Sequence, residues 1–269
     1  MIMLVNICKE FIMRIWSNIY KQDIETELDF IFEHSILKNQ LWEKFICDTI
    51  FLNYVPDTDI IDVGANIGLI TLGTLLVADF YKININQIHC FECNYHNFAK
   101  LAFNTQNKSA VALYNMGLGD TTKLATMTFN KHNNGASFIS QIVDASAGVV
   151  NHLPEIFTKP EFSAAFISEK IYINIVPLDS IMHQFTTPVS VVKVDIEGYE
   201  YEFLVGARAF LAQHRPALII EIMPEYQEKI VALLTEYKYY MAAKLDYHNW
   251  LYKPQQPPTA PTTEDYAPS

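Results

Sequence analysis

Short apolar runs alternate along the middle of the chain with longer stretches whose apolar residues recur at helical spacing. The apolar runs predict strands at 59–64, 87–92, 111–116, 189–198 and 216–222, and the longer stretches predict helices at 69–82, 94–107, 199–214 and 225–237. Alternation of this kind is typical of βαβ units. The sequence therefore predicts an α/β, Rossmann-like fold with a mostly parallel sheet and helices on both faces.

Two segments later in the chain break this alternation. Residues 121–180 contain apolar stretches on either side of a polar loop, and they predict an insertion with extra antiparallel strands that covers one end of the sheet. Residues 239–245 and 248–253 are expected to pair as a terminal antiparallel hairpin. Residues 254–269 are rich in proline and predict a disordered tail.

The first 55 residues are expected to form a helical segment in front of a catalytic domain at 56–253, and within 24–54 the residues Leu37, Leu41 and Phe45 recur at helical spacing. Polar residues within 1–21 recur at roughly helical spacing and leave a wide apolar face. That face predicts a helix packed on the domain, and a membrane-surface helix is the alternative. Charges at Lys9, Glu10 and Arg14 interrupt any signal-peptide or membrane-spanning core.

Charge and cysteine content narrow the classes of partner. The 269 residues carry a formal net charge of -11, which disfavours nucleic acid as a partner and suits a cationic ligand. Four cysteines are too few for a disulfide framework, so a cytoplasmic location is expected. Cys90 and Cys93 form an isolated CxxC pair, which we interpret as two ordinary thiols at the edge of the core.

Ligands of open parallel sheets bind beyond the carboxyl ends of the strands, so the residues at those ends are the candidates for chemistry. The first strand runs into a loop from Asp62 to Gly68. Gly64 permits a tight turn, and Gly68 lets the first helical turn approach the sheet or a ligand closely. Asp62 is placed to accept a hydrogen bond from an ammonium or hydroxyl group.

The next two strand ends are also acidic. Glu92 is placed to accept hydrogen bonds from the two hydroxyls of a ribose, and Asp120 from the amine of an adenine. Together with Asp62 these residues suit a nucleoside. A dinucleotide would favour a G-x-G-x-x-G loop, which is absent. S-adenosylmethionine carries no pyrophosphate, and its ammonium and sulfonium groups suit carboxylates.

A third group of polar residues ends the strand at 189–198. Lys193, Asp195 and Glu197 share one face of that strand by its two-residue period. Charged residues are seldom fully buried without partners, so this row indicates a site, with Lys193 as a candidate ion-pair partner of a carboxylate. Glu221 ends the next strand and can join them. Two such carboxylates could instead hold Mg²⁺, although no metal is expected.

These motifs resemble the FkbM-type family of S-adenosylmethionine-dependent methyltransferases. The resemblance rests on the following segments: DVGANIG at 62–68, FE and HNFAKLAFN within 91–104, GLGD at 117–120, LDS at 178–180, VVKVDIEGYE at 191–200, LVGA at 204–207 and RPALIIEI at 215–222. It implies a class I methyltransferase sheet. It also implies that Asp62, Gly64, Asn66 and Gly68 hold the methionine part of the cofactor, that Glu92 binds the ribose and Asp120 lies near the adenine, and that Lys193, Asp195 and Glu197 form the reaction face.

The expected activity is methyl transfer to a hydroxyl of a sugar, glycan or small metabolite. Such a hydroxyl needs a general base, for which Asp195 and Glu197 are the candidates. One alternative is a nicotinamide-dependent oxidoreductase acting on a nucleotide-sugar, although the third phosphate-loop glycine is missing and no Tyr-xxx-Lys pair stands in the right place. A non-catalytic protein that binds S-adenosylmethionine is the other.

Overall fold

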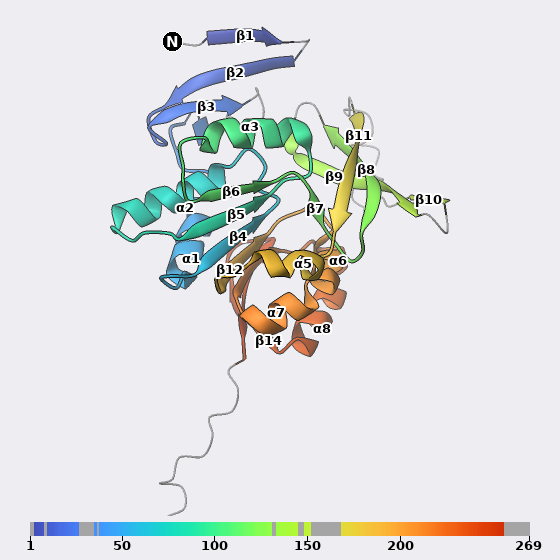
Figure 1. Ribbon diagram of the computed structural model, residues 1–269. Helices are drawn as coiled ribbons and strands as arrows, with labels where there is room; N and C mark the ends of the chain where they lie inside the picture. Colours follow the sequence, from blue (N-terminus) through green and yellow to red (C-terminus); the bar gives the residue numbers. More distant parts are fainter. Residues whose placement is uncertain are drawn as a thin grey trace, which may run out of the picture.

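The computed structural model describes residues 3–7, 10–26, 35–36, 38–130, 133–144, 148–151 and 168–255. Its centre is a seven-stranded sheet in the order β14-β15-β13-β12-β4-β5-β6 (Figure 1). The strands are β4 (Asp59–Val63), β5 (Gln87–Phe91), β6 (Val111–Tyr114), β12 (Val189–Val194), β13 (Ala217–Glu221), β14 (Tyr239–Lys244) and β15 (Asn249–Pro254). The first five pair in parallel, and β15 and β14 add an antiparallel hairpin. This arrangement confirms the predicted α/β sheet.

Helices cover both faces of this sheet because its strands bury alternate residues on opposite sides. Ile61 and Val63 pack among residues of the helices that follow β12 and β13, whereas Ile60 packs against the helices that precede β4 and follow β4 and β5. The helices are α1 (Lys44–Asn53), α2 (Leu69–Phe80), α3 (Tyr95–Thr105), α5 (Leu178–Ile181), α6 (Glu200–Gly206), α7 (Arg208–His214) and α8 (Gln227–Glu236), with 3-10 turns η3 (Met182–Gln184) and η4 (Pro224–Tyr226).

The single helix predicted over 199–214 is two helices, α6 and α7, which meet at Ala207. The carboxylate of Asp179 accepts hydrogen bonds from the backbone N–H groups of Ala209 and Phe210, at 2.9 and 2.8 Å, and so caps the second helix. A side chain from a distant segment therefore starts α7, which the local pattern could not indicate.

A second, five-stranded sheet lies beside the central one, in the order β10-β9-β8-β11-β7. Its strands are β7 (Gly117–Leu118), β8 (Lys123–Asn130), β9 (Asn133–Asp144), β10 (Gly148–Asn151) and β11 (Ser168–Val176). All pairs are antiparallel except β11 with β7. The expected extra antiparallel strands are thus present, and residues 152–167 of the predicted insertion lie outside the described residues.

The helix expected over residues 1–21 is wrong. These residues contribute to an antiparallel sheet of β1 (Met3–Ile7), β2 (Glu10–Ser17) and β3 (Gln22–Thr26), which lies over α3 (Figure 1). β2 is rich in aromatic and β-branched residues, which favour strands. Asn104 of α3 hydrogen-bonds both the N–H and the carbonyl of Glu25, so the edge of β3 is satisfied. The membrane-surface helix considered for this segment is absent from its described residues.

The predictions for residues 24–54 and for the C-terminal tail are tested only in part by the described residues. The helical pattern expected over 24–54 holds for α1 alone among the described residues, and Leu37 lies outside them. The tail predicted from residue 254 lies outside them from residue 256 onward. The domain boundaries at 55 and 253 and the cytoplasmic location stay predictions. Within the described part of the chain, no helix has the length and apolar character needed to cross a bilayer.

Candidate functional site

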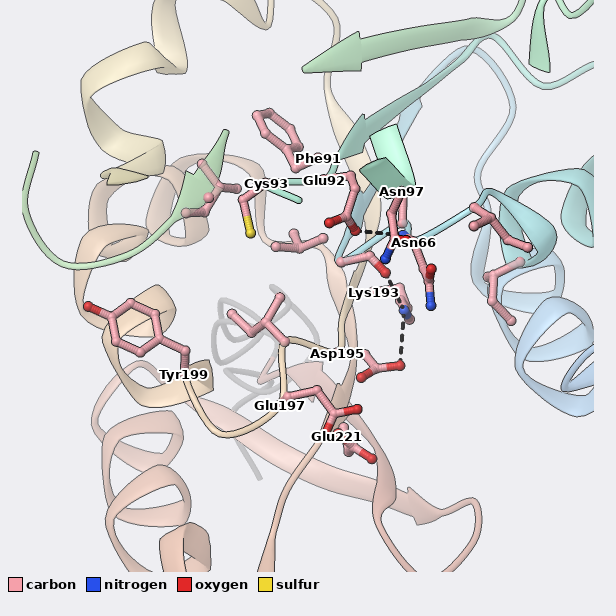
Figure 2. Close-up of a pocket in the computed structure, with 18 of the residues that line it drawn as sticks. Asn66, Phe91, Glu92, Cys93, Asn97, Lys193, Asp195, Glu197, Tyr199 and Glu221 are labelled. Atoms are coloured by element: carbon pink, nitrogen blue, oxygen red, sulfur yellow. Dashed lines mark hydrogen bonds and ion pairs between the residues drawn. The ribbon is translucent and has the colours of Figure 1, made fainter. Parts of the chain in front are cut away.

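A cavity of about 330 Å³ opens where the carboxyl ends of β4, β5, β12 and β13 meet (Figure 2). This is the edge at which parallel sheets bind ligands, and the volume lies in the range of small-molecule pockets. The residues predicted from the sequence that line it are Gly64, Asn66, Glu92, Lys193, Asp195, Glu197 and Glu221. Asp62, Gly68 and Asp120 do not line it.

The loop between β4 and α2 depends on three residues with positive φ. Gly64 has φ +79°, and a Cβ added there would lie 1.8 Å from the carbonyl oxygen of Asp195. Asn66 has φ 51°, a left-handed conformation that asparagine tolerates. Gly68 has φ +89°, and its close approach is to Leu101 of α3 rather than to the cavity. The glycine turn is therefore packed directly against the backbone that carries Asp195.

A buried ion-pair network joins the first and third motifs. Lys193 is 3% exposed, and its Nζ lies 3.2 Å from Asp195 Oδ2, 3.6 Å from Asp62 Oδ1 and 3.4 Å from the carbonyl oxygen of Gly64. Asp62, 2% exposed, also accepts a hydrogen bond from Thr71. Burial alone would lower the pKa of Lys193, but Asp195 and Asp62 raise it above its ordinary value. The predicted ion pairing of Lys193 is confirmed, and Asp62 acts as its buried counter-ion.

Glu92 ends β5 with its carboxylate at the cavity wall. Oε2 accepts a hydrogen bond from the N–H of Asn66 and Oε1 from the N–H of Asn94, both at 2.8 Å. Burial raises the pKa of Glu92 to about 7, against the opposing effect of these two donors. Each carboxylate oxygen has a second lone pair, so Glu92 can fix the glycine loop and still accept hydrogen bonds from a ligand.

Three carboxylates gather beyond β12 and β13. Asp195, Glu197 and Glu221 each place an oxygen within 4.8 Å of the others, and Figure 2 shows them along one side of the cavity. Burial raises the pKa of Glu197 and of Glu221, and the charge of Asp195 raises both further. Both carboxyl groups therefore keep a proton to higher pH than an ordinary glutamate does. Oxygen ligands of this kind also suit a divalent cation.

Glu43 lines the same cavity and was missed by the sequence analysis. It directly precedes α1 and has a left-handed backbone, with φ 42° and ψ 51°. Burial, and then the charge of Asp195, raise the pKa of Glu43 to about 7. The helical pattern expected over 24–54 placed this residue inside a helix, so no local signal marked it. The neighbouring Trp42 also lines the cavity.

The opposite wall is mostly apolar. Met116 and Leu118 reach it from the end of β6 and from β7, and Met127 and Ile173 reach it from the second sheet. Cys93 also lies there as a free thiol, and burial raises its pKa. A wall of this kind suits a flat, weakly polar group such as a purine.

Asp120 is a predicted site residue that does not line the cavity. Its carboxylate lies 2.5 Å from the ammonium of Lys123, in the turn between β7 and β8. The chain leaves the cavity after Leu118, because β7 is only two residues long and pairs with β11. The adenine contact implied for Asp120 stays a prediction.

Comparison with known proteins gives one family match. The model of the methyltransferase FkbM domain matches residues 62–241, which is more than half of the 269 residues. No curated protein sequence matches the chain. The match begins at Asp62, so it includes the three motifs around the cavity and excludes Glu43.

Several solved structures are similar in fold at low identity. A methyltransferase FkbM from Methylobacillus flagellatus is 18% identical over 74% of this chain and 44% of its own, with a TM-score of 0.46. The chain thus spans less than half the length of that protein. An S-adenosylhomocysteine-bound methyltransferase of Podospora anserina is 7% identical over 79% and 77% of the two chains, with a TM-score of 0.42. The fibrillarin pre-rRNA processing protein of Methanococcus jannaschii is 9% identical over 94% and 96%, with a TM-score of 0.42. Identities this low say nothing about substrate.

Proposed function

The chain belongs to the FkbM methyltransferase family, and from that premise we propose that it transfers a methyl group from S-adenosylmethionine to a hydroxyl oxygen of a sugar, glycan or other small metabolite. The observation that carries the proposal is the composition of the cavity. Its charged lining residues, within the described part of the chain, are Glu43, Glu92, Lys193, Asp195, Glu197 and Glu221. Burial raises the pKa of Glu43, Glu92, Glu197 and Glu221, so a cationic ligand that favours the ionised carboxylates is stabilised in this cavity.

The residues of the cavity fit this cofactor better than a dinucleotide. Glu92 offers its remaining lone pairs to ribose hydroxyls, and the apolar wall around Leu118 suits the adenine. A nicotinamide dinucleotide would bring a negatively charged pyrophosphate toward the carboxylates, which repel it. When bound, S-adenosylmethionine supplies an electrophilic methyl group on a sulfonium. The protein has to hold the acceptor hydroxyl in line with that methyl group and remove its proton.

Asp195 is the carboxylate best placed to remove that proton. The ammonium of Lys193 lies 3.2 Å from Asp195 Oδ2 and holds that carboxylate at the cavity. Burial, and then the charge of Asp195, raise the pKa of Glu197 and of Glu221, which suits these two carboxyl groups to donate a hydrogen bond. Of the two bases considered from the sequence, the geometry favours Asp195, with Glu197 as a hydrogen-bond donor to the acceptor.

Replacing Asp195 with asparagine is expected to lower kcat by 100-fold or more, while S-adenosylhomocysteine affinity changes by less than about threefold. The assay follows radiolabelled methyl transfer to a panel of free sugars, nucleotide-sugars and oligosaccharides. Glu236→Gln, an exposed carboxylate paired with Arg208, is the matched control and should leave turnover unchanged. A folded Asp195→Asn protein with full turnover would remove Asp195 as the base. Loss of wild-type activity in the presence of a chelator would instead indicate that these carboxylates bind a metal ion.

Replacing Glu92 with glutamine is expected to weaken S-adenosylhomocysteine binding by about tenfold. A glutamine amide has one oxygen, so it cannot accept from both Asn66 and Asn94 and still serve a ribose. Asp120→Asn makes the same chemical change outside the cavity, and its affinity should equal that of the wild type. Calorimetric titration compares the three proteins, and the reverse order of effects would put the cofactor on Asp120.

A further inference from the structure

The side chain of Glu43 lies at the cavity edge of the sheet although its segment precedes the domain matched by the family. α1 packs on α2, β12 and β13. The last turn of α1 lies at the edge of the sheet where the strands begin. There the N–H of Val55 donates a hydrogen bond to Ser190 Oγ at the start of β12, at 3.1 Å. The first turn of α1 is therefore at the carboxyl edge, and Glu43 lines the cavity there.

The carboxylate of Glu43 makes no hydrogen bond within the described part of the chain. It does not cap α1, and no described residue donates a hydrogen bond to it. The charges that act on it are Asp195, Lys193, Asp246 and Asp62. Because Lys193 is already held between Asp62 and Asp195, it is not free to neutralise a further carboxylate. A cationic ligand group at this end of the cavity would therefore pair with Glu43 and favour its ionised form.

The sheet order identifies which cationic group reaches Glu43. Glu92 ends β5, whereas the two strongest charges acting on Glu43, Asp195 and Lys193, lie at the end of β12, two strands away in the order β5-β4-β12. A ligand whose ribose lies at Glu92 must extend across β4 to reach Glu43. Adjacent strands are about 4.8 Å apart, so β5 and β12 are separated by about 10 Å, a distance that an amino-acid chain attached to the ribose can bridge together with the side chains of Glu92 and Glu43. In S-adenosylmethionine that chain ends in an α-ammonium group.

We propose that Glu43 binds the α-ammonium group of the methionine portion of the cofactor through a charge-assisted hydrogen bond. The proposal rests on the proposed function, because it takes S-adenosylmethionine as the ligand. It adds a binding residue from outside residues 62–241, the part of the chain that the family model matches. Glu43 thereby makes the first turn of α1 part of the cofactor site.

The test compares two ligands that differ in the amino-acid chain. S-adenosylhomocysteine carries the ammonium group and no sulfonium, whereas 5′-methylthioadenosine has the same adenosine and thioether without the amino acid. In calorimetric titrations, Glu43→Gln is expected to weaken S-adenosylhomocysteine at least tenfold and to change methylthioadenosine by less than twofold. Asp48→Asn, on the same helix and outside the cavity, is the matched control and should change neither.

Each outcome separates this inference from the proposed function. If Glu43→Gln binds S-adenosylhomocysteine as tightly as the wild type does, the proposed ammonium contact is refuted. This is also the result expected if Glu43 binds the methyl acceptor instead of the cofactor. Equal weakening of both ligands also refutes the ammonium contact. Failure of the wild type to bind either ligand overturns the proposed function instead. If Glu43→Gln does not fold, the wild-type protein is titrated with the deaminated analogue of S-adenosylhomocysteine. This analogue is expected to bind at least tenfold more weakly than S-adenosylhomocysteine. Equal affinity for the two ligands would refute the contact between Glu43 and the ammonium group.

Discussion

Replacing Lys193 with methionine is expected to lower the free energy of unfolding by about 3–5 kcal/mol. Asp62 is 2% exposed and shares Lys193 with Asp195, so the variant leaves a buried carboxylate without a cation. Methionine fills much of the volume of the lysine stem, so the loss reflects the missing charge more than a cavity. Denaturant unfolding followed by circular dichroism measures the effect.

Two further variants identify the cause of that loss. Asp62→Asn combined with Lys193→Met removes the buried charge while Thr71 can still donate to the amide oxygen, so most of the stability should return. Lys44→Met is the matched control, because Lys44 is an exposed lysine paired with Asp48 and should change stability by less than about 1 kcal/mol. A Lys193→Met protein as stable as the wild type would show that Asp62 does not need its counter-ion.

Replacing Gly64 with alanine is expected to destabilise the protein by about 3 kcal/mol or more and to abolish cofactor binding. The new Cβ would lie 1.8 Å from the carbonyl oxygen of Asp195, and that oxygen belongs to the backbone and cannot move as a side chain can. The φ of +79° adds strain for any residue with a side chain. Thermal unfolding and titration with S-adenosylhomocysteine measure the two effects.

Gly117→Ala is the matched control for this change. Gly117 also lines the cavity, but a Cβ there would meet its nearest neighbour, Ile175, at 3.4 Å, so the expected loss of stability is below about 1 kcal/mol. Equal melting temperatures for Gly64→Ala and wild type would show that the turn can move away from Asp195. The contact between the two motifs would then not hold the site together.

The central sheet could be predicted because its strands are buried on both faces and its helices on one. The run from Asp59 to Val63 is buried at every position and apolar except at its two aspartates, while α3 keeps its apolar residues at helical spacing. The N-terminal sheet could not be predicted, because a short amphipathic stretch fits both the helical period and the two-residue period of a strand. What decides it is tertiary: Asn104 satisfies the edge of β3.

The site residues that stand at the ends of strands could be predicted from the sequence, whereas those from other elements could not. Lys193 and Asp195 share a strand face by period two, and the structure places both at the cavity beside Asp62. Glu43 comes from a segment whose approach depends on how α1 packs against the sheet. Asp120 fits the same strand-end rule, but it lies in the turn after β7, where it pairs with Lys123 and does not line the cavity. Local pattern thus indicates which residues end strands, and long-range pairing decides which of them face the ligand.

Titration of the wild-type protein with S-adenosylhomocysteine tests the central claim most directly. The account predicts saturable binding at one site per chain, with NADH producing no fluorescence change under the same conditions. A folded protein that binds NADH and does not bind S-adenosylhomocysteine would contradict it, because the carboxylate-lined cavity would then accept a pyrophosphate and reject the cationic cofactor.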